Sequence, residues 1–144
     1  MGHRFTNTPA EVSARMRLIR SKNTKPELRL FSMLSAAGIK FTSHRQVAGI
    51  TVDAAIGRDL LVFVDSPFWH LRDLADLKRM SPYWQWRLIR NRQRDYRQRR
   101  KLRTLGFSVV RFWADQLDDD DRLLRRLKAV RSRAKTRRAG KKQQ

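Results

Sequence analysis

Apolar residues recur at helical spacing in the first quarter of the chain. Four of them fall three positions apart, on one face of a predicted helix: Leu28, Phe31, Leu34 and Ala37. This helix begins at Thr24-Lys25-Pro26-Glu27, where a threonine N-cap precedes a glutamate by three residues, and it ends at Gly38. Thr8-Pro9-Ala10-Glu11 also has a threonine N-cap followed three residues later by a glutamate, and it predicts an earlier helix that ends near Arg20.

The apolar pattern becomes typical of β-strands after Gly38. Residues 40–46 predict an edge strand, and residues 52–56 predict a second strand. The apolar run 60–64 predicts a third strand that is buried on both faces, joined to the second by the turn Gly57-Arg58-Asp59. Residues 66–81 show weak periodicity and predict a structured loop.

Helical spacing returns at Pro82 and continues to Leu105, with Trp84 and Leu88 predicted to face inward and Trp86 and Ile89 as further candidates for that face. Residues 107–113 predict a fourth strand. The carboxylates of 118–121 favour the start of a last helix, whose apolar stripe has four members: Leu123, Leu124, Leu127 and Val130. The order α, α, β, β, β, α, β, α predicts an α/β fold, a small mixed sheet flanked by helices.

The charge of the chain indicates a polyanionic partner. Its 144 residues include 34 Lys or Arg against 13 Asp or Glu, a net charge of +21, which favours nucleic acid over a membrane surface. The longest apolar run has five residues, against the roughly 20 that a membrane span needs, and the first residues lack a signal-peptide pattern. We expect a cytoplasmic monomer with one domain over residues 1–130 and a basic, disordered tail over residues 131–144.

Two aspartates of the predicted hairpin are candidates for a metal site. With a three-residue turn, Asp53 lies opposite Phe63, and alternation puts Asp65 on the same face of the sheet. Carboxylates this close repel each other unless a proton or a cation neutralises them, so they could share Mg²⁺. The alternative is that Asp65 only ends a strand and caps the following loop.

Two further segments contain residues that could bind nucleic acid or take part in its cleavage. Phe68 and Trp69 suggest stacking on bases, and His70 could act as a general base, although a lone histidine is more often structural. The helix after Pro82 has nine Lys or Arg between positions 87 and 103, with Asp95 as its single acid. Arg87, Arg90 and Arg94 are therefore candidate phosphate contacts, and Asp95 could be either functional or part of a local ion pair.

An ordered set of segments resembles the very short patch repair endonucleases, which nick DNA at mismatches. The matching segments are Met16–Glu27, Asp53, Val62–Val64, Phe68–His70, Tyr83-Trp84, Asn91–Asp95, Leu105–Val110 and Trp113. The resemblance implies a restriction-endonuclease-like fold and nicking on the 5′ side of the thymine of a T:G mismatch, with a 5′-phosphate left behind.

The resemblance also implies roles for individual residues. Mg²⁺ would be held by Asp53 and the carbonyl of Val64, and His70 would activate the attacking water. Glu27 and Asp95 would belong to the same active site. Phe68, Trp69 and Trp84 would enter the DNA beside the mismatch.

The chain departs from the family at two places. It has no cysteine, and the positions of the family's structural zinc ligands are occupied by Pro67, Arg72, Leu74 and Asp115, so we expect no structural zinc. We expect packing of Pro67, Leu71 and Leu74 against Trp113 to replace the cross-link that the zinc ion provides in the family. Asp65 stands where the family has a second histidine, which makes it a candidate catalytic residue and metal ligand.

The sequence therefore predicts a Mg²⁺-dependent endonuclease that acts on double-stranded DNA at or near T:G mismatches. It would associate with the nucleoid when bound to DNA, and its partners could include proteins linked to DNA repair or methylation. The alternatives are a related nuclease without mismatch preference that cuts modified or foreign DNA, and a non-catalytic DNA-binding protein.

Overall fold

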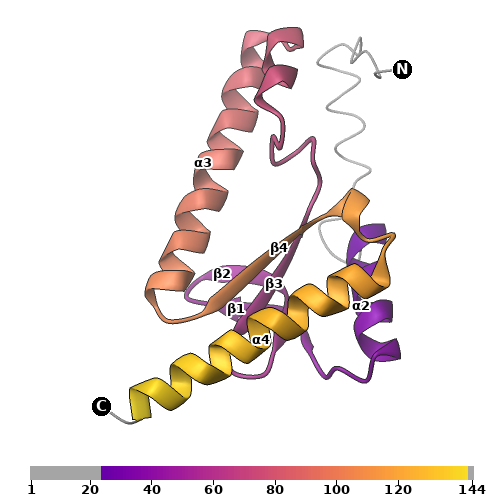
Figure 1. Cartoon of the computed structure of the whole chain (residues 1–144). Helices are drawn as coiled ribbons and strands as arrows, with labels where there is room; N and C mark the ends of the chain where they lie inside the picture. Colours follow the sequence, from indigo (N-terminus) through magenta and orange to yellow (C-terminus); the bar gives the residue numbers. More distant parts are fainter. Residues whose placement is uncertain (1–23, 143–144) are drawn as a thin grey trace.

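Four strands form one mixed sheet in the computed structural model, which describes residues 24–142 (Figure 1). Their order is β1 (Thr42–Val47), β2 (Ile50–Ile56), β3 (Leu60–Asp65) and β4 (Ser108–Trp113). The first three are antiparallel neighbours, whereas β4 is parallel to β3. This confirms the predicted α/β fold and mixed sheet, while the helix predicted to end near Arg20 lies outside the described residues.

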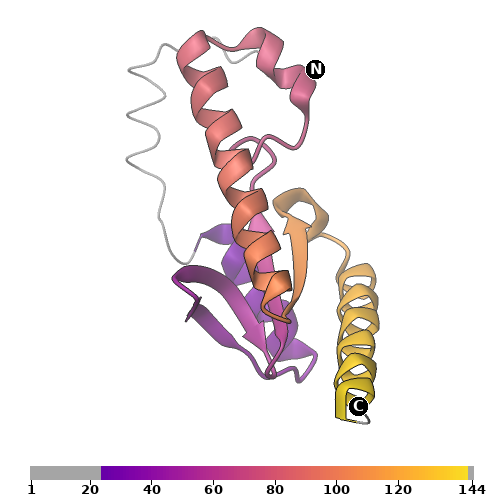
Figure 2. The same ribbon diagram turned by 90° about the vertical axis from the view of Figure 1, so that its left-hand side faces the viewer.

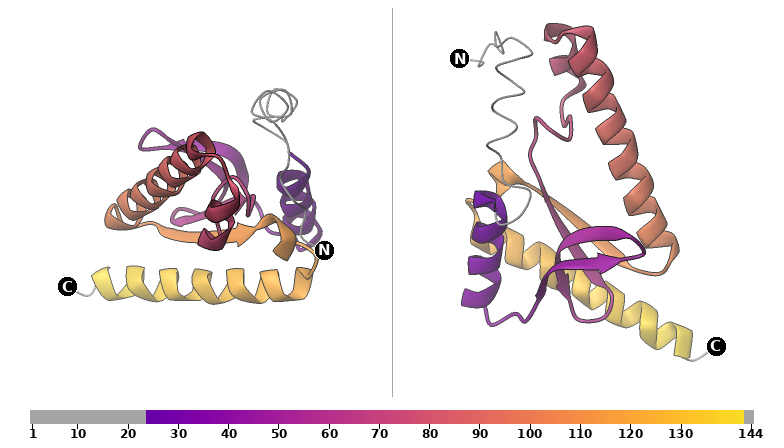
Figure 3. Two further views of the ribbon diagram at one scale, coloured as in Figure 1. Left: turned by 90° about the horizontal axis from the view of Figure 1, so that it is seen from above. Right: turned by 180° about the vertical axis from the view of Figure 1, so that it is seen from behind.

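Helices cover both faces of the sheet (Figure 3). On one face, α2 (Lys25–Ala36) and α4 (Asp120–Lys142) pack through Leu30 and Leu127 against Val62, Phe112 and their neighbours. On the other face, α3 (Pro82–Thr104) contributes Leu102 to a second cluster with Leu61 and Phe63. The parallel pair β3 and β4 needs a crossover connection, and α3 supplies it.

The segment between β3 and α3 runs alongside α3 to its N-terminal end (Figure 2). It includes the 3₁₀ helix η1 (Leu74–Arg79), and a second short 3₁₀ helix, η2 (Ala114–Gln116), follows β4. The predicted loop over residues 66–81 is therefore confirmed apart from η1. Residues 66–71 therefore follow the end of β3, and Leu71 packs against Leu88 of α3.

The β2–β3 register confirms the predicted three-residue turn. Ala54 pairs with Val62 and Ile56 with Leu60, so the same register sets Asp53 opposite Phe63. Asp53 and Asp65 therefore share the face of the sheet that α3 covers.

The buried stripe of α2 differs from the prediction. Leu30, Met33 and Leu34 are buried together with Glu27, whereas Leu28 is 49% exposed and Ala37 is exposed. The helix is rotated because Glu27 faces inward, where its carboxylate accepts a hydrogen bond from the Thr24 N–H at 3.1 Å.

The last helix runs further than expected. Leu123 and Leu127 are buried as predicted, but α4 continues to Lys142, through residues that we expected to form a disordered tail. Residues 131–142 have no proline and are rich in Ala, Arg and Lys, which favour a helix. None of the helices within residues 24–142 has the length and apolar character needed to cross a membrane.

Candidate active site

A cleft of about 520 Å³ lies between the first turn of α2, the sheet and the middle of α3. All five residues predicted to be catalytic line it: Glu27, Asp53, Asp65, His70 and Asp95. They come from α2, β2, β3, the following loop and α3, so the fold gathers residues that are up to 68 positions apart in the chain. His44 of β1 lines the same cleft and was not predicted.

Asp53 and Glu27 occupy one side of the cleft together with His44. The Asp53 carboxylate accepts a hydrogen bond from the Val64 N–H at 2.7 Å. His44 Nε2 lies 3.8 Å from Glu27 Oε2. One potential ligand atom from each of the three side chains lies within 4.8 Å of the others, so this group could hold a metal ion.

The surroundings of Asp53 disfavour its charged form. Burial raises its pKa from 3.8 to about 7, against the lowering effect of the Val64 N–H, and the nearby Glu27 carboxylate raises it further. A cation would offset the same burial and repulsion.

Asp65 occupies the other side of the cleft and is held by two arginines. Its Oδ2 forms an ion pair with the Arg99 guanidinium and lies 2.6 Å from Arg111 Nε. Burial raises the pKa of Asp65, while His70 and Arg99 act to lower it. Because two guanidinium groups already balance this carboxylate, its predicted role as a ligand of a shared cation stays a prediction.

His70 lies between two carboxylates. Its Nδ1 is hydrogen-bonded to Asp95, and its Nε2 is 3.4 Å from Asp65 Oδ1. The backbone N–H of His70 donates to the Ser66 carbonyl at 3.1 Å, which fixes the loop that presents the ring. Asp95 is buried on the inner side of α3 and pairs with His70, so its predicted role in the active site stays a prediction.

The three predicted DNA-entering aromatics come together, but they differ in exposure. Trp69 lies 4.7 Å from the Phe68 ring and 6.0 Å from the Trp84 ring. Trp84 is only 6% exposed and packs with Leu71 and Leu88, whereas Phe68 and Trp69 are half-buried. The predicted inward orientation of Trp84 is confirmed, whereas the further candidates Trp86 and Ile89 are exposed. Trp69 is the member of the three that also lines the cleft.

The three predicted phosphate contacts lie along α3 beside the cleft. Arg87, Arg90 and Arg94 line a shallow hollow of about 270 Å³ that also includes Trp86 and Arg97. The Arg90 guanidinium lies 4.8 Å from the centre of the Trp86 ring. Arg94 lines both this hollow and the cleft, so positive charge continues from one to the other.

Two of the positions that the resemblance assigns to zinc ligands are joined by an ion pair. Arg72 Nη1 lies 2.8 Å from Asp115 Oδ1, and a second contact joins Nη2 to Oδ2. This bidentate hydrogen bonding lowers the pKa of Asp115. The predicted packing against Trp113 is wrong, because Leu74 is 54% exposed and Leu71 packs with Trp84 instead.

Two residues of the cleft, Arg99 and His44, and one partner of Asp65, Arg111, were missed by reasoning from the sequence. Arg99 follows Asp95 by four positions and so shares its side of α3, which is a pattern that could have identified it. Arg111 pairs with Phe63 in the sheet, and His44 belongs to an edge strand. Neither position stands out before the register is known.

Comparisons with known proteins identify the family of the chain. Residues 6–76 match the family described as DNA mismatch endonuclease Vsr. The type II nicking enzyme V.XorIIP of Xanthomonas oryzae pv. oryzae (strain KACC10331 / KXO85) is 34% identical over 119 residues, which cover 80% of this chain and 88% of that protein. V.NmeDIP, a type II nicking enzyme of Neisseria meningitidis serogroup C, is 30% identical over 76% of this chain and 78% of its own length.

A solved structure shows the same fold. The catalytic domain of the homing endonuclease I-Bth0305I superposes with a TM-score of 0.58 at 21% identity, over 78% of this chain and 98% of that domain. The sheet and its flanking helices are therefore restriction-endonuclease-like.

Proposed function

Because the chain belongs to the Vsr family of DNA endonucleases, we propose that it nicks duplex DNA at T:G mismatches with the help of Mg²⁺, on the 5′ side of the mismatched thymine. The product would keep a 5′-phosphate. The observation that supports this proposal most is the position of His70, between two carboxylates and in the same cleft as Glu27 and Asp53.

Asp53 and Glu27 would hold the divalent cation, with the Val64 carbonyl as a further oxygen ligand. Two carboxylates fit a hard cation, and no Lys or Arg among the described residues forms an ion pair with either of them. When bound, the cation stabilises the negative charge that develops on the scissile phosphate.

His70 would act as the general base. With its Nδ1–H donated to Asp95, its Nε2 is the acceptor and can take a proton from the attacking water. Asp95 would hold the ring in this tautomer and stabilise the imidazolium that forms, as the buried acid of a catalytic triad does.

Asp65 would position His70 and receive its new N–H. Its Oδ1 faces His70 Nε2 at 3.4 Å, while its Oδ2 is engaged by Arg99 and Arg111. We favour this role over a direct metal ligand because both arginines already compensate its charge. The family's second histidine is thereby replaced by a carboxylate held by two cations.

The duplex would lie along the basic side of α3. Arg87, Arg90 and Arg94 would contact phosphates, and Phe68 with Trp69 would probe the stacked bases next to the cleft. Opening a stacked step costs a few kcal/mol, and less where pairing is already weak, so a wedge favours a T:G wobble over T:A. Trp84 would support Trp69 from beneath, since it is packed in the cluster of Leu71 and Leu88.

The test is cleavage of a T:G duplex and of its T:A control, each labelled on both strands, in the presence of Mg²⁺. We expect one nick on the thymine strand of the T:G duplex, a product that a ligase can reseal, and a much slower reaction on T:A. Equal rates on the two duplexes would refute mismatch preference and favour a nuclease for modified or foreign DNA. No cleavage of either duplex would refute the proposed reaction.

A further inference from the structure

The register of β1 and β2 brings a histidine to the metal side of the cleft. Ser43 pairs with Ala54 and Arg45 pairs with Val52, so His44 lies directly across the ladder from Asp53. His44 has a φ of +52°, a left-handed backbone conformation that is uncommon for a residue with a side chain.

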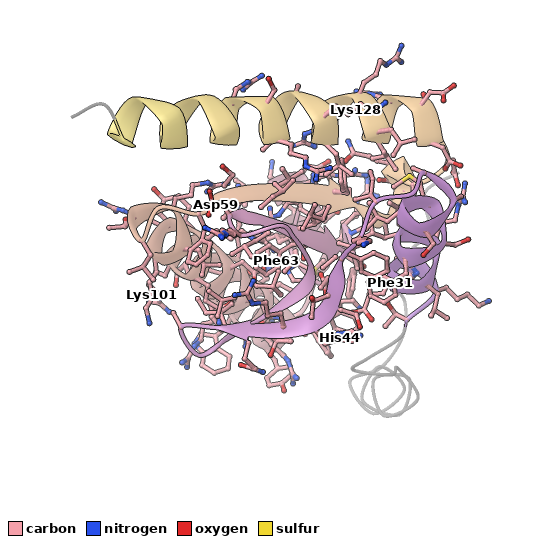
Figure 4. The ribbon with its side chains drawn as sticks, turned by 90° about the horizontal axis from the view of Figure 1, so that it is seen from below. Phe31, His44, Asp59, Phe63, Lys101 and Lys128 are labelled. Carbon is pink, nitrogen blue, oxygen red and sulfur yellow. The ribbon has the colours of Figure 1, made fainter. Side chains whose placement is uncertain are left out.

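The ring of His44 is directed towards the carboxylates by its contacts. Its Nε2 lies 3.8 Å from Glu27 Oε2, and the ring meets Phe31 edge-on at 5.7 Å between centroids. Figure 4 shows His44 beside α2, close to Phe31. A nitrogen donor therefore lies next to the two oxygen donors, each from a different element of the fold.

The charge of this group differs from that of the rest of the cleft. Asp65 is balanced by Arg99 and Arg111, and Asp95 is paired with His70. Glu27 is 7% exposed, and among the described residues its ion-pair partner is His44. One buried and one half-buried carboxylate beside one imidazole thus form a compact donor set.

We propose that His44 is a nitrogen ligand of the cation that Glu27 and Asp53 hold, and that this ligand makes the site prefer a first-row transition ion such as Mn²⁺ to Mg²⁺. Mg²⁺ takes oxygen ligands almost exclusively, whereas imidazole suits the later divalent ions, and Mn²⁺ accepts both kinds of donor. The inference rests on the proposed function for the location of the cation and adds its third protein ligand and its selectivity.

Mn²⁺ alone, added to the metal-free full chain without DNA, provides the test. Electron spin-echo modulation should show a directly coordinated ¹⁴N nucleus on the bound Mn²⁺. The chain has three histidines, so the double substitution His3→Gln with His70→Gln leaves only His44, and the nitrogen signal should persist in it. The signal should disappear in His44→Gln.

Binding constants provide the second readout. In His44→Gln we expect the Mn²⁺ affinity to fall by about tenfold or more, while Mg²⁺ affinity, measured by competition with Mn²⁺, changes by less than about threefold. Circular dichroism checks that the variant is folded. If His44→Gln does not fold, the ¹⁴N signals of the wild type and of the double variant His3→Gln with His70→Gln still test whether His44 is a ligand.

Absence of ¹⁴N modulation in folded, Mn²⁺-bound wild type would overturn the inference, as would its persistence in His44→Gln. Equal losses of Mn²⁺ and Mg²⁺ affinity would overturn the selectivity. These outcomes are separate from failure of the proposed function, because cleavage of the T:G duplex in Mg²⁺ is measured independently of nitrogen ligation.

Discussion

Replacing Asp53 by asparagine should stabilise the metal-free protein at neutral pH. The pKa of Asp53 is raised from 3.8 to about 7, mainly by burial. A carboxyl whose pKa is higher in the folded state contributes most stability below its unfolded-state pKa of 3.8, and the contribution is lost as the pH rises towards 7. About three pKa units at about 1.4 kcal/mol each give a loss of up to about 4 kcal/mol.

The amide oxygen introduced by Asp53→Asn would still accept the hydrogen bond from the Val64 N–H, without the cost of a buried charge. In EDTA, we measure the free energy of unfolding with denaturant, followed by tryptophan fluorescence. The difference between Asp53→Asn and the wild type should grow in favour of the variant from about pH 4 to about pH 7 and stay constant at higher pH. Adding a divalent cation should stabilise the wild type and leave the variant unchanged.

Asp118→Asn is the matched control, because Asp118 is exposed in the turn before α4. Its unfolding free energy should differ from that of the wild type by the same small amount at every pH. If Asp53→Asn shows no pH-dependent gain, or if the wild type is the more stable of the two at about pH 8 in EDTA, the electrostatic account of this site is refuted.

Four further predictions concern the rest of the molecule. Arg72→Gln should lower the free energy of unfolding by at most about 1 kcal/mol, because the ion pair of Arg72 with Asp115 is exposed, and a larger loss would contradict this prediction. Elemental analysis of the wild type should find no stoichiometric zinc, and one tightly bound zinc per chain would contradict that expectation. Truncation after Val130 removes seven cations, so the log–log salt dependence of DNA binding should become shallower by several units, at about 0.9 per phosphate contact; an unchanged slope would mean that this part of α4 does not touch DNA. Trp69→Ala should reduce the ratio of T:G to T:A cleavage rates while non-specific binding stays close to that of the wild type, and an unchanged ratio would rule out Trp69 as the wedge.

Much of the fold could be predicted because local chemistry and tertiary structure agree. The apolar run 60–64 became β3, and the turn 57–59 determined the register that places Asp53 and Asp65 on one face. The capping box at Thr24 located the start of α2. The predicted apolar stripe of α2 was wrong because Glu27 of this capping box faces inward, so that the buried face passes through Leu30 and Met33.

The partners within the site could not be predicted in the same way. His44 reaches Asp53 only through the pairing of β1 with β2, and Arg111 reaches Asp65 only through a parallel pair that α3 connects. The ion pair between Arg72 and Asp115, at two positions that the resemblance assigns to zinc ligands, joins residues 43 positions apart. Such contacts depend on the whole topology, which periodicity along one segment does not contain.

The measurement that tests the central claim most directly is nicking of a T:G duplex by Asp53→Asn beside the wild type and the surface variant Asp118→Asn. We predict cation-dependent nicking by the wild type and Asp118→Asn, its abolition by EDTA, and no nicking by Asp53→Asn, although this variant binds the duplex as tightly as the wild type. The positive surface of α3 is unchanged in it, so binding should persist. Nicking by Asp53→Asn at the wild-type rate would contradict the assignment of this cleft as the active site.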